Sequence, residues 1–139
     1  MTALPSTVEP ITPLPPTTRP RRSWYAKFED AFRGLKRGIR GHSSFFVHFF
    51  FAALVCVAAF VFRCTSTDWA ILLLCIGFVL TAELFNSAIE TLFRGLDQEL
   101  RDRIYPCLDI AAGAVLLASI TAAIVGLIVF FNRLLEPAV

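Results

Sequence analysis

The sequence predicts an all-α integral membrane protein with three transmembrane helices, preceded by an amphipathic surface helix. Apolar residues make up 56% of the 139-residue chain. They gather in three long blocks, at residues 45–62, 69–93 and 110–131. Each block is close to the roughly 20 residues that cross a bilayer core. None alternates with the period of two that marks half-buried strands, so helices are favoured.

The chain before the first block divides into a tail and a helix. Residues 1–23 hold six of the eight prolines, interleaved with threonines, which predicts a disordered tail. The remaining residues, 24–139, then form a single membrane-embedded domain. Within residues 24–40, apolar side chains recur every three or four positions and basic side chains fill the rest, as in an amphipathic helix. Such a helix is expected to lie in the membrane interface, either as an anchor or as a wall of the active site.

The basic residues predict the orientation of the spans. Eight of the thirteen Lys and Arg residues lie within residues 1–40. With the N-terminus in the cytoplasm, only Arg63 and Arg133 face the far side, as the positive-inside rule requires. Residues 63–68 then form a tight outer turn, and residues 94–106 form a cytoplasmic loop. Pro106 suits the first turn of the third span, whose many small residues predict a place inside the bundle.

Two carboxylates lie inside the second block. Its sequence is WAILLLCIGFVLTAELFNSAIETLF, and Glu83, Asn86 and Glu90 follow one another at i, i+3 and i+7. At 3.6 residues per turn, the three fall within about 60° on one face of the helix. A carboxylate at hydrocarbon depth costs about 2.5 to 3.5 kcal/mol on insertion scales, and such residues usually have a function. Polar contacts that only hold helices together more often use Ser, Thr, Asn or Gln.

This face of the second span predicts phosphoryl transfer at the membrane edge. Asp109 opens the third span at the same level as Glu90, and Glu83 lies about 10 Å deeper. Carboxylates at an aqueous edge suit Mg²⁺ held partly by substrate phosphates. A carboxylate shielded from water suits a general base. The pattern fits transfer from a soluble nucleotide to a lipid hydroxyl.

Other common sites are not predicted. The sequence contains no Walker A motif and no GxGxxG, so it does not encode a familiar soluble nucleotide-binding fold. The four cysteines form no CxxC pair, which argues for structural cysteines and against a zinc site. No nucleic-acid partner is expected.

The residues of the second and third spans resemble a known family. The run AELFNSAIE at residues 82–90, followed by LDIAAGAVLLA from Leu108, resembles the small prokaryotic integral-membrane diacylglycerol kinases and their undecaprenol kinase relatives. The segments AFRGL and DWAILLL add to the resemblance. It implies a Mg²⁺- and ATP-dependent lipid kinase of the bacterial inner membrane that works as a homotrimer.

The resemblance also implies roles for individual residues. Glu83 corresponds to the general base, and Asn86 to the polar residue beside it. Glu90 corresponds to a ligand of Mg²⁺-ATP. Glu99 corresponds to a nucleotide-contacting acid, and Asp109 to the aspartate of a Lys-Asp pair.

Three positions depart from the family pattern. His42 stands where the family has a glutamate that binds metal. It is still a candidate metal ligand, although imidazole suits Zn²⁺ or Mn²⁺ better than Mg²⁺. Leu108 stands where the family has the lysine of the Lys-Asp pair. Arg94 replaces an aspartate, and it could supply the missing positive charge, as could Arg101 or Arg103. His48 is expected to be structural.

Three functions remain open from the sequence. The first is an active kinase acting on diacylglycerol or undecaprenol. The second is a catalytically degenerate member that binds lipid or regulates a partner. The third, a small ion-conducting or transport bundle, lacks the inverted repeats and broken helices that transporters show.

Overall fold

A computed structural model describes residues 23–41 and 44–135, and every regular element within them is an α-helix. Three of the helices are long and apolar enough to cross a membrane, which confirms the three predicted spans. Nearly all of the predicted tail lies outside the described residues. The helices are α1 (Trp24–Gly41), α2 (Ser44–Val61), α3 (Ser66–Arg94), α4 (Gln98–Ile104) and α5 (Pro106–Leu135).

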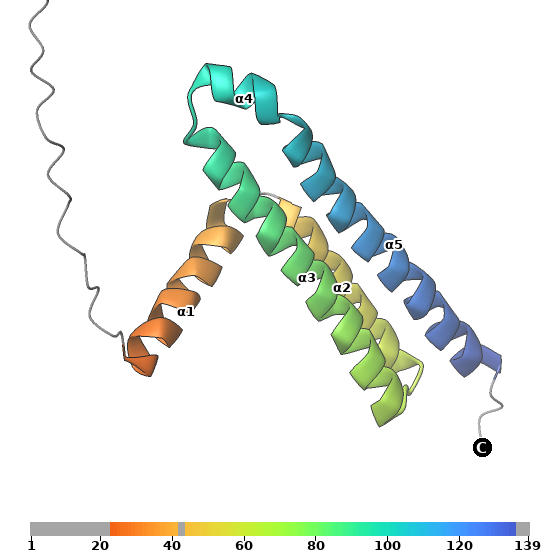
Figure 1. Ribbon diagram of the computed structural model, residues 1–139. Coiled ribbons are helices and arrows are strands. Elements are labelled where there is room, and N and C mark those ends of the chain that lie inside the picture. Colours follow the sequence, from red (N-terminus) through yellow and green to blue (C-terminus); the bar gives the residue numbers. More distant parts are fainter. Residues whose placement is uncertain (1–22, 42–43, 136–139) are drawn as a thin grey trace, which may run out of the picture.

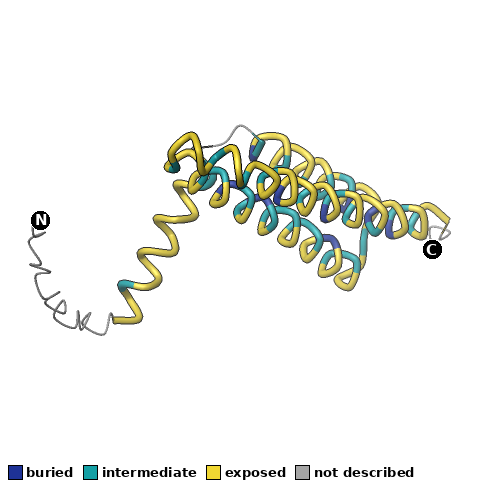
Figure 2. The backbone as a smooth tube through the Cα atoms, turned by 45° about the horizontal axis from the view of Figure 1, so that its top comes forward, coloured by how far each residue is buried: buried dark blue, intermediate teal, exposed yellow. Residues whose placement is uncertain are grey.

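The three long helices form one bundle, and α1 diverges from it (Figure 1). Helices α3 and α5 run antiparallel to each other and are joined by α4, while α2 packs against α3. The buried residues lie within the bundle, whereas α1 is exposed along almost its whole length (Figure 2). We refer to the two ends of the bundle as the α4 end and the turn end, the latter after the turn at residues 62–65.

Helix α3 begins with a capping box at the turn end. The Thr65 hydroxyl accepts a hydrogen bond from the backbone N–H of Asp68, and the Asp68 carboxylate accepts one from the backbone N–H of Thr65. Because this cap starts the helix at Ser66, the predicted turn at 63–68 is shorter than expected. Arg133 of α5 reaches across to the same carboxylate, with Nε 2.6 Å from Oδ2. The cap therefore also ties α3 to α5.

A small apolar core lies beside this cap. Ala59, Leu72 and Val129 are buried together, one from each spanning helix, and Phe130 packs against them. Cys64 also packs there, and burial raises the pKa of its thiol. The Cys64 thiol therefore stays neutral and acts as a small apolar group.

Helix α5 packs along α3 through small residues. Its first residue is Pro106, as predicted, because proline lacks the backbone N–H that the first turn leaves unpaired. Ala111, Ala118 and Gly126 are buried on one side of it. A Cβ added to Gly126 would lie 4.0 Å from Leu72 Cδ2, an ordinary van der Waals contact. Small side chains thus bring the two helices close together.

The segment between α3 and α5 corrects one prediction. Residues 94–106 were expected to form a loop, but residues 98–104 form the helix α4. Asp97 caps this helix by accepting a hydrogen bond from the backbone N–H of Leu100. Side-chain pairs four residues apart add support, namely Gln98 with Asp102 and Glu99 with Arg103. Residues 98–104 therefore form a helix, although their charged side chains suggested a loop.

Helix α1 meets α3 at a glycine. A Cβ added to Gly38 would lie only 2.8 Å from Leu84 Cδ2, whereas one added to Gly34 would have no neighbour within 4 Å. Of these two glycines, only Gly38 thus marks a close helix approach. Since Leu84 follows Glu83 in the chain, the crossing lies at the level of Glu83 along α3, but on a different face of that helix.

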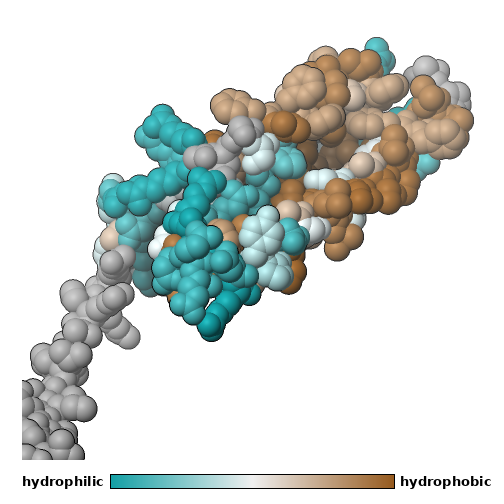
Figure 3. All heavy atoms as spheres, turned by 90° about the horizontal axis from the view of Figure 1, so that it is seen from above, coloured by the Kyte–Doolittle hydropathy of each residue, from teal (hydrophilic) through white to brown (hydrophobic). Residues whose placement is uncertain are grey.

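The bundle leaves most of its apolar surface uncovered. Only 11% of the α2 span and 22% of each of the α3 and α5 spans is buried within the chain. Hydrophobic residues cover the bundle away from α1 and α4, and hydrophilic residues gather around these two helices (Figure 3). Surface of this kind is stable only against lipid or against further protein.

Candidate active site

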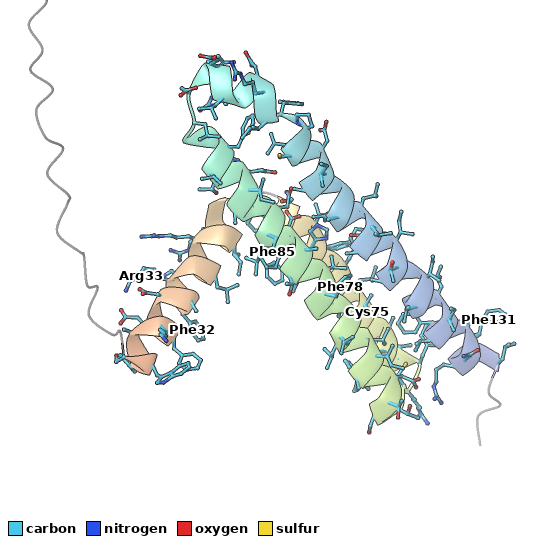
Figure 4. All side chains as sticks on the ribbon, in the orientation of Figure 1. Phe32, Arg33, Cys75, Phe78, Phe85 and Phe131 are labelled. Carbon is cyan, nitrogen blue, oxygen red and sulfur yellow. The ribbon has the colours of Figure 1, made fainter. Side chains whose placement is uncertain are left out.

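Glu83 is buried in the bundle, facing α2. Its side chain is 3% exposed, and the hydroxyl of Ser44 donates a hydrogen bond to its Oε1. His48 Nε2 lies 3.7 Å from its Oε2, which is too long for a hydrogen bond. Phe85 points away from the bundle on the opposite side of α3 and is exposed (Figure 4). One face of α3 is therefore polar and enclosed, and the other is apolar and open.

The partners of Glu83 come from the first turns of α2. Ser44 and His48 are four residues apart, so they lie on the same face of that helix. A buried carboxylate requires hydrogen-bonding partners, and these two side chains provide a polar surrounding in an otherwise apolar helix. The sequence does not predict this arrangement, because Ser44 belongs to no recognisable motif and the expected role of His48 is structural. The i, i+4 spacing of two polar residues at the start of the span was the available signal.

An apolar cavity of about 560 Å³ extends from this site between the three spanning helices. His48 lines this cavity and also lies beside Glu83, so the cavity begins next to the polar side chains around Glu83. Further along, the lining consists of apolar and small side chains, including Phe51, Leu72, Ala122 and Gly126. A cavity of this size and polarity is typical of sites that hold small apolar ligands.

A second polar cluster follows on α3, toward the α4 end. The amide nitrogen of Asn86 donates to Glu90 Oε1 over 3.0 Å. Arg94 Nη2 lies 3.1 Å from Glu90 Oε2, so both carboxylate oxygens have partners on the same helix. The Glu90 side chain is 33% exposed. Glu83 is thus enclosed, whereas Glu90 is partly exposed.

The remaining predicted site residues are more dispersed. Glu99 is exposed on α4 and pairs with Arg103, and Asp109 is exposed in the first turn of α5. His42 lies outside the described residues. Within residues 23–41 and 44–135, no three His, Cys, Asp or Glu side chains come together as a metal-binding group. The structure therefore brings Asn86 and Glu90 into contact, and it does not gather the acids into one cluster.

These residues fit a magnesium ion that arrives with a nucleotide. Mg²⁺ is commonly held by one or two carboxylates, with substrate phosphates and water completing its shell. Glu90 offers hard carboxylate oxygens at a partly exposed position, and the amide of Asn86 already orients one of them. Within the part of the chain that the structure describes, the donor set does not fit a resident ion held by protein alone.

Comparison with known protein families identifies the family of this chain. Residues 29–130 match the family described as prokaryotic diacylglycerol kinase. The chain belongs to this family. An undecaprenol kinase from Bacillus subtilis (strain 168) is 29% identical over 111 residues, which cover 80% of this chain and 90% of that protein. No solved structure matches the chain significantly.

Membership of the diacylglycerol kinase family identifies the chain as a membrane-embedded lipid kinase, in agreement with the predicted enzyme class. The match begins in α1 and ends near the end of α5, so it includes both polar clusters of α3. It also includes Arg94 and Leu108, two of the positions that the sequence predicts to depart from the family pattern. Arg94 forms the ion pair with Glu90.

Proposed function

We propose that this chain transfers the terminal phosphoryl group of ATP to the hydroxyl group of a membrane lipid alcohol, either undecaprenol or diacylglycerol. The observation that carries the proposal is the separation of two carboxylates on one helix. Glu83 is enclosed next to an apolar cavity, and Glu90 is partly exposed about two turns nearer the α4 end. This separation suits a reaction between a lipid and a water-soluble nucleotide.

In this proposal Glu83 acts as the general base. Among the described residues no hydrogen bond reaches its Oε2, and Ser44 holds the other carboxylate oxygen. Oε2 accepts the proton of the lipid hydroxyl group while the oxygen of this hydroxyl group forms a bond to the γ-phosphorus of ATP. The bond between the γ-phosphorus and the β,γ-bridging oxygen breaks, and ADP leaves. The products are the lipid phosphate, ADP and the protonated Glu83.

The other predicted residues bind and orient the nucleotide. Asn86 fixes one oxygen of Glu90, and Glu90 would hold the Mg²⁺ that accompanies the phosphates. Bound there, the ion would neutralise phosphate charge. Glu99 and Asp109 lie at the same end of the bundle and are proposed to contact the nucleotide. For His42, the proposed role of a further ligand rests on the sequence alone.

The setting of the reaction is also proposed. The distribution of Lys and Arg supports a bacterial inner-membrane protein with a cytoplasmic N-terminus, and therefore an α4 end on the cytoplasmic side. Trp24, Tyr25, Phe28 and Phe32 are exposed on α1, which supports its contact with the interface. The uncovered apolar faces of the spans are compatible with a homotrimer.

The proposal is tested with the purified full-length chain and radiolabelled ATP. Undecaprenol and diacylglycerol are supplied separately in mixed micelles, and the labelled lipid is separated from ATP. We expect label on at least one of the two lipids, and a rate of labelling about 10²- to 10⁴-fold lower when Glu83→Gln replaces the parent chain. Absence of label on both lipids would refute the proposal.

One observation favours a second candidate, a family member that binds lipid without turnover. The Arg94–Glu90 ion pair places a cation on the carboxylate that is proposed to hold Mg²⁺. If that pair persists, the nucleotide site is closed to the metal. The same assay separates the two candidates, because a lipid-binding member retains undecaprenol but incorporates no label.

A further inference from the structure

Three arginines gather at the α4 end, and two of them have carboxylate partners. Arg94 pairs with Glu90, and Arg103 Nη2 lies 2.7 Å from Glu99 Oε1. Both pairs join residues one helical turn apart and are largely exposed. Their charges are therefore at least partly compensated within their own helices.

Arg101 is held differently. Its Nη2 donates a hydrogen bond to the backbone carbonyl oxygen of Arg94, at the end of α3. Its guanidinium carbon lies 6.0 Å from the centroid of the Phe93 ring. Its Nε is buried, and no hydrogen-bond acceptor for it exists within the described residues. The side chain is thus fixed in place with one donor unused.

The nearby acids do not pair with Arg101 in the described structure. Asp97 caps α4 through the backbone N–H of Leu100, and Asp102 accepts a hydrogen bond from Gln98. A guanidinium group presents five N–H donors in a planar fork that matches a phosphate. A buried donor without an acceptor is unfavourable, so an anion brought to this position would gain a ready-made partner.

We propose that Arg101 binds a phosphate of the nucleotide and thereby supplies the cation that position 108, a leucine, cannot supply. The inference rests on the proposed function, because it takes ATP as the phosphoryl donor. Phe93 and the Arg94 carbonyl orient the guanidinium at the end of α3, one turn beyond Glu90. Arg101 is the nucleotide-binding cation, and Arg94 and Arg103 are not.

A simpler role for Arg101 is to cap the C-terminus of α3. Cations stabilise helix C-termini and can hydrogen-bond the last carbonyl groups. The bond to the Arg94 carbonyl fits this role, but the buried and unused Nε does not. The two roles also differ in what they predict, because a cap changes stability and a phosphate ligand changes nucleotide affinity.

The test compares Arg101→Gln with Arg103→Gln, which removes the same charge two residues away. Binding of a non-hydrolysable ATP analogue to the full-length chain is measured by calorimetry, together with KM for ATP and for lipid. We expect Arg101→Gln to weaken analogue binding about tenfold to a hundredfold, as for loss of a charge-assisted contact. KM for lipid should be unchanged, and Arg103→Gln should bind the analogue like the parent.

A second variant keeps the inference falsifiable if Arg101→Gln unfolds. Arg101→Lys retains a cation that can still bond the Arg94 carbonyl but lacks the planar fork, so it should fold and still bind the analogue more weakly than the parent. Equal analogue affinity in the parent and Arg101→Lys, or loss of stability alone in Arg101→Gln, would show that Arg101 is only a cap. A parent that binds no analogue would also overturn the inference. A parent that binds it through Arg101 without labelling lipid would instead overturn the proposed function.

Discussion

Replacement of Glu83 by glutamine tests the central assignment most directly. The two side chains have nearly the same shape, and the glutamine oxygen can still accept the hydrogen bond from Ser44. Because Glu83 is only 2% exposed, the substitution removes a buried charge rather than a solvated one. Removal of a buried charge in favour of a neutral isostere is typically neutral or stabilising. We therefore expect Glu83→Gln to fold like the parent.

The same substitution should abolish most of the activity. A positioned general base contributes about 10²- to 10⁴-fold to a rate, which corresponds to about 2.7 to 5.4 kcal/mol of activation free energy. The measurement is the initial rate of lipid phosphorylation at saturating ATP and lipid, beside unfolding in SDS as a check on the fold. Ser87→Ala is a matched control, because Ser87 is equally buried on α3 and its hydroxyl has no hydrogen-bond partner among the described residues.

The outcome separates chemistry from packing. If Glu83→Gln folds and its rate stays within about tenfold of the parent, below the range expected for a base, Glu83 is not the general base. If it unfolds while Ser87→Ala does not, the carboxylate is needed for the fold, and its burial says nothing about catalysis. Only a folded and nearly inactive variant agrees with the proposed role.

Three further predictions concern the nucleotide site and the α1 crossing. Glu90→Ala should raise KM for Mg-ATP more than KM for lipid, since Glu90 is partly exposed and is proposed to hold the Mg²⁺ of the nucleotide; equal changes would contradict the assignment. Leu108→Lys should restore part of the analogue affinity lost in Arg101→Gln, measured by calorimetry, and no recovery would place position 108 away from the phosphates. Gly38→Val should lower activity in the phosphorylation assay, because an added side chain collides with Leu84, whereas Gly34→Val has open space. Equal activities of the two valine variants would show that the close approach of α1 is unimportant.

The helices could be predicted from the sequence because their signals are local. Hydropathy over a window of about 20 residues predicts each span, and the structure has a spanning helix at each predicted position. The helix over residues 98–104 was missed because its support comes from a cap at Asp97 and from pairs four residues apart. In a short segment rich in charged residues, the same sequence pattern is also typical of an exposed loop.

The site could be predicted in part. The spacing of Glu83, Asn86 and Glu90 places them on one face of a helix, and the contact between Asn86 and Glu90 follows from that spacing alone. The prediction that Asp109 lies at the same level as Glu90 stays a prediction. Asp109 belongs to a different helix, and its position relative to Glu90 depends on how α5 packs against α3.

Composition and periodicity by themselves determined that this chain crosses a membrane three times and carries two carboxylates on one helix face. Both properties depend only on residues a few positions apart. Tertiary structure alone decided that Ser44 and His48 meet Glu83 from α2, and that α1 touches α3 at Gly38. It also decided that Arg101 is held at the end of α3. These contacts join residues that are distant in the chain or lie on different helices, so they depend on the packing of whole helices, which no local pattern specifies.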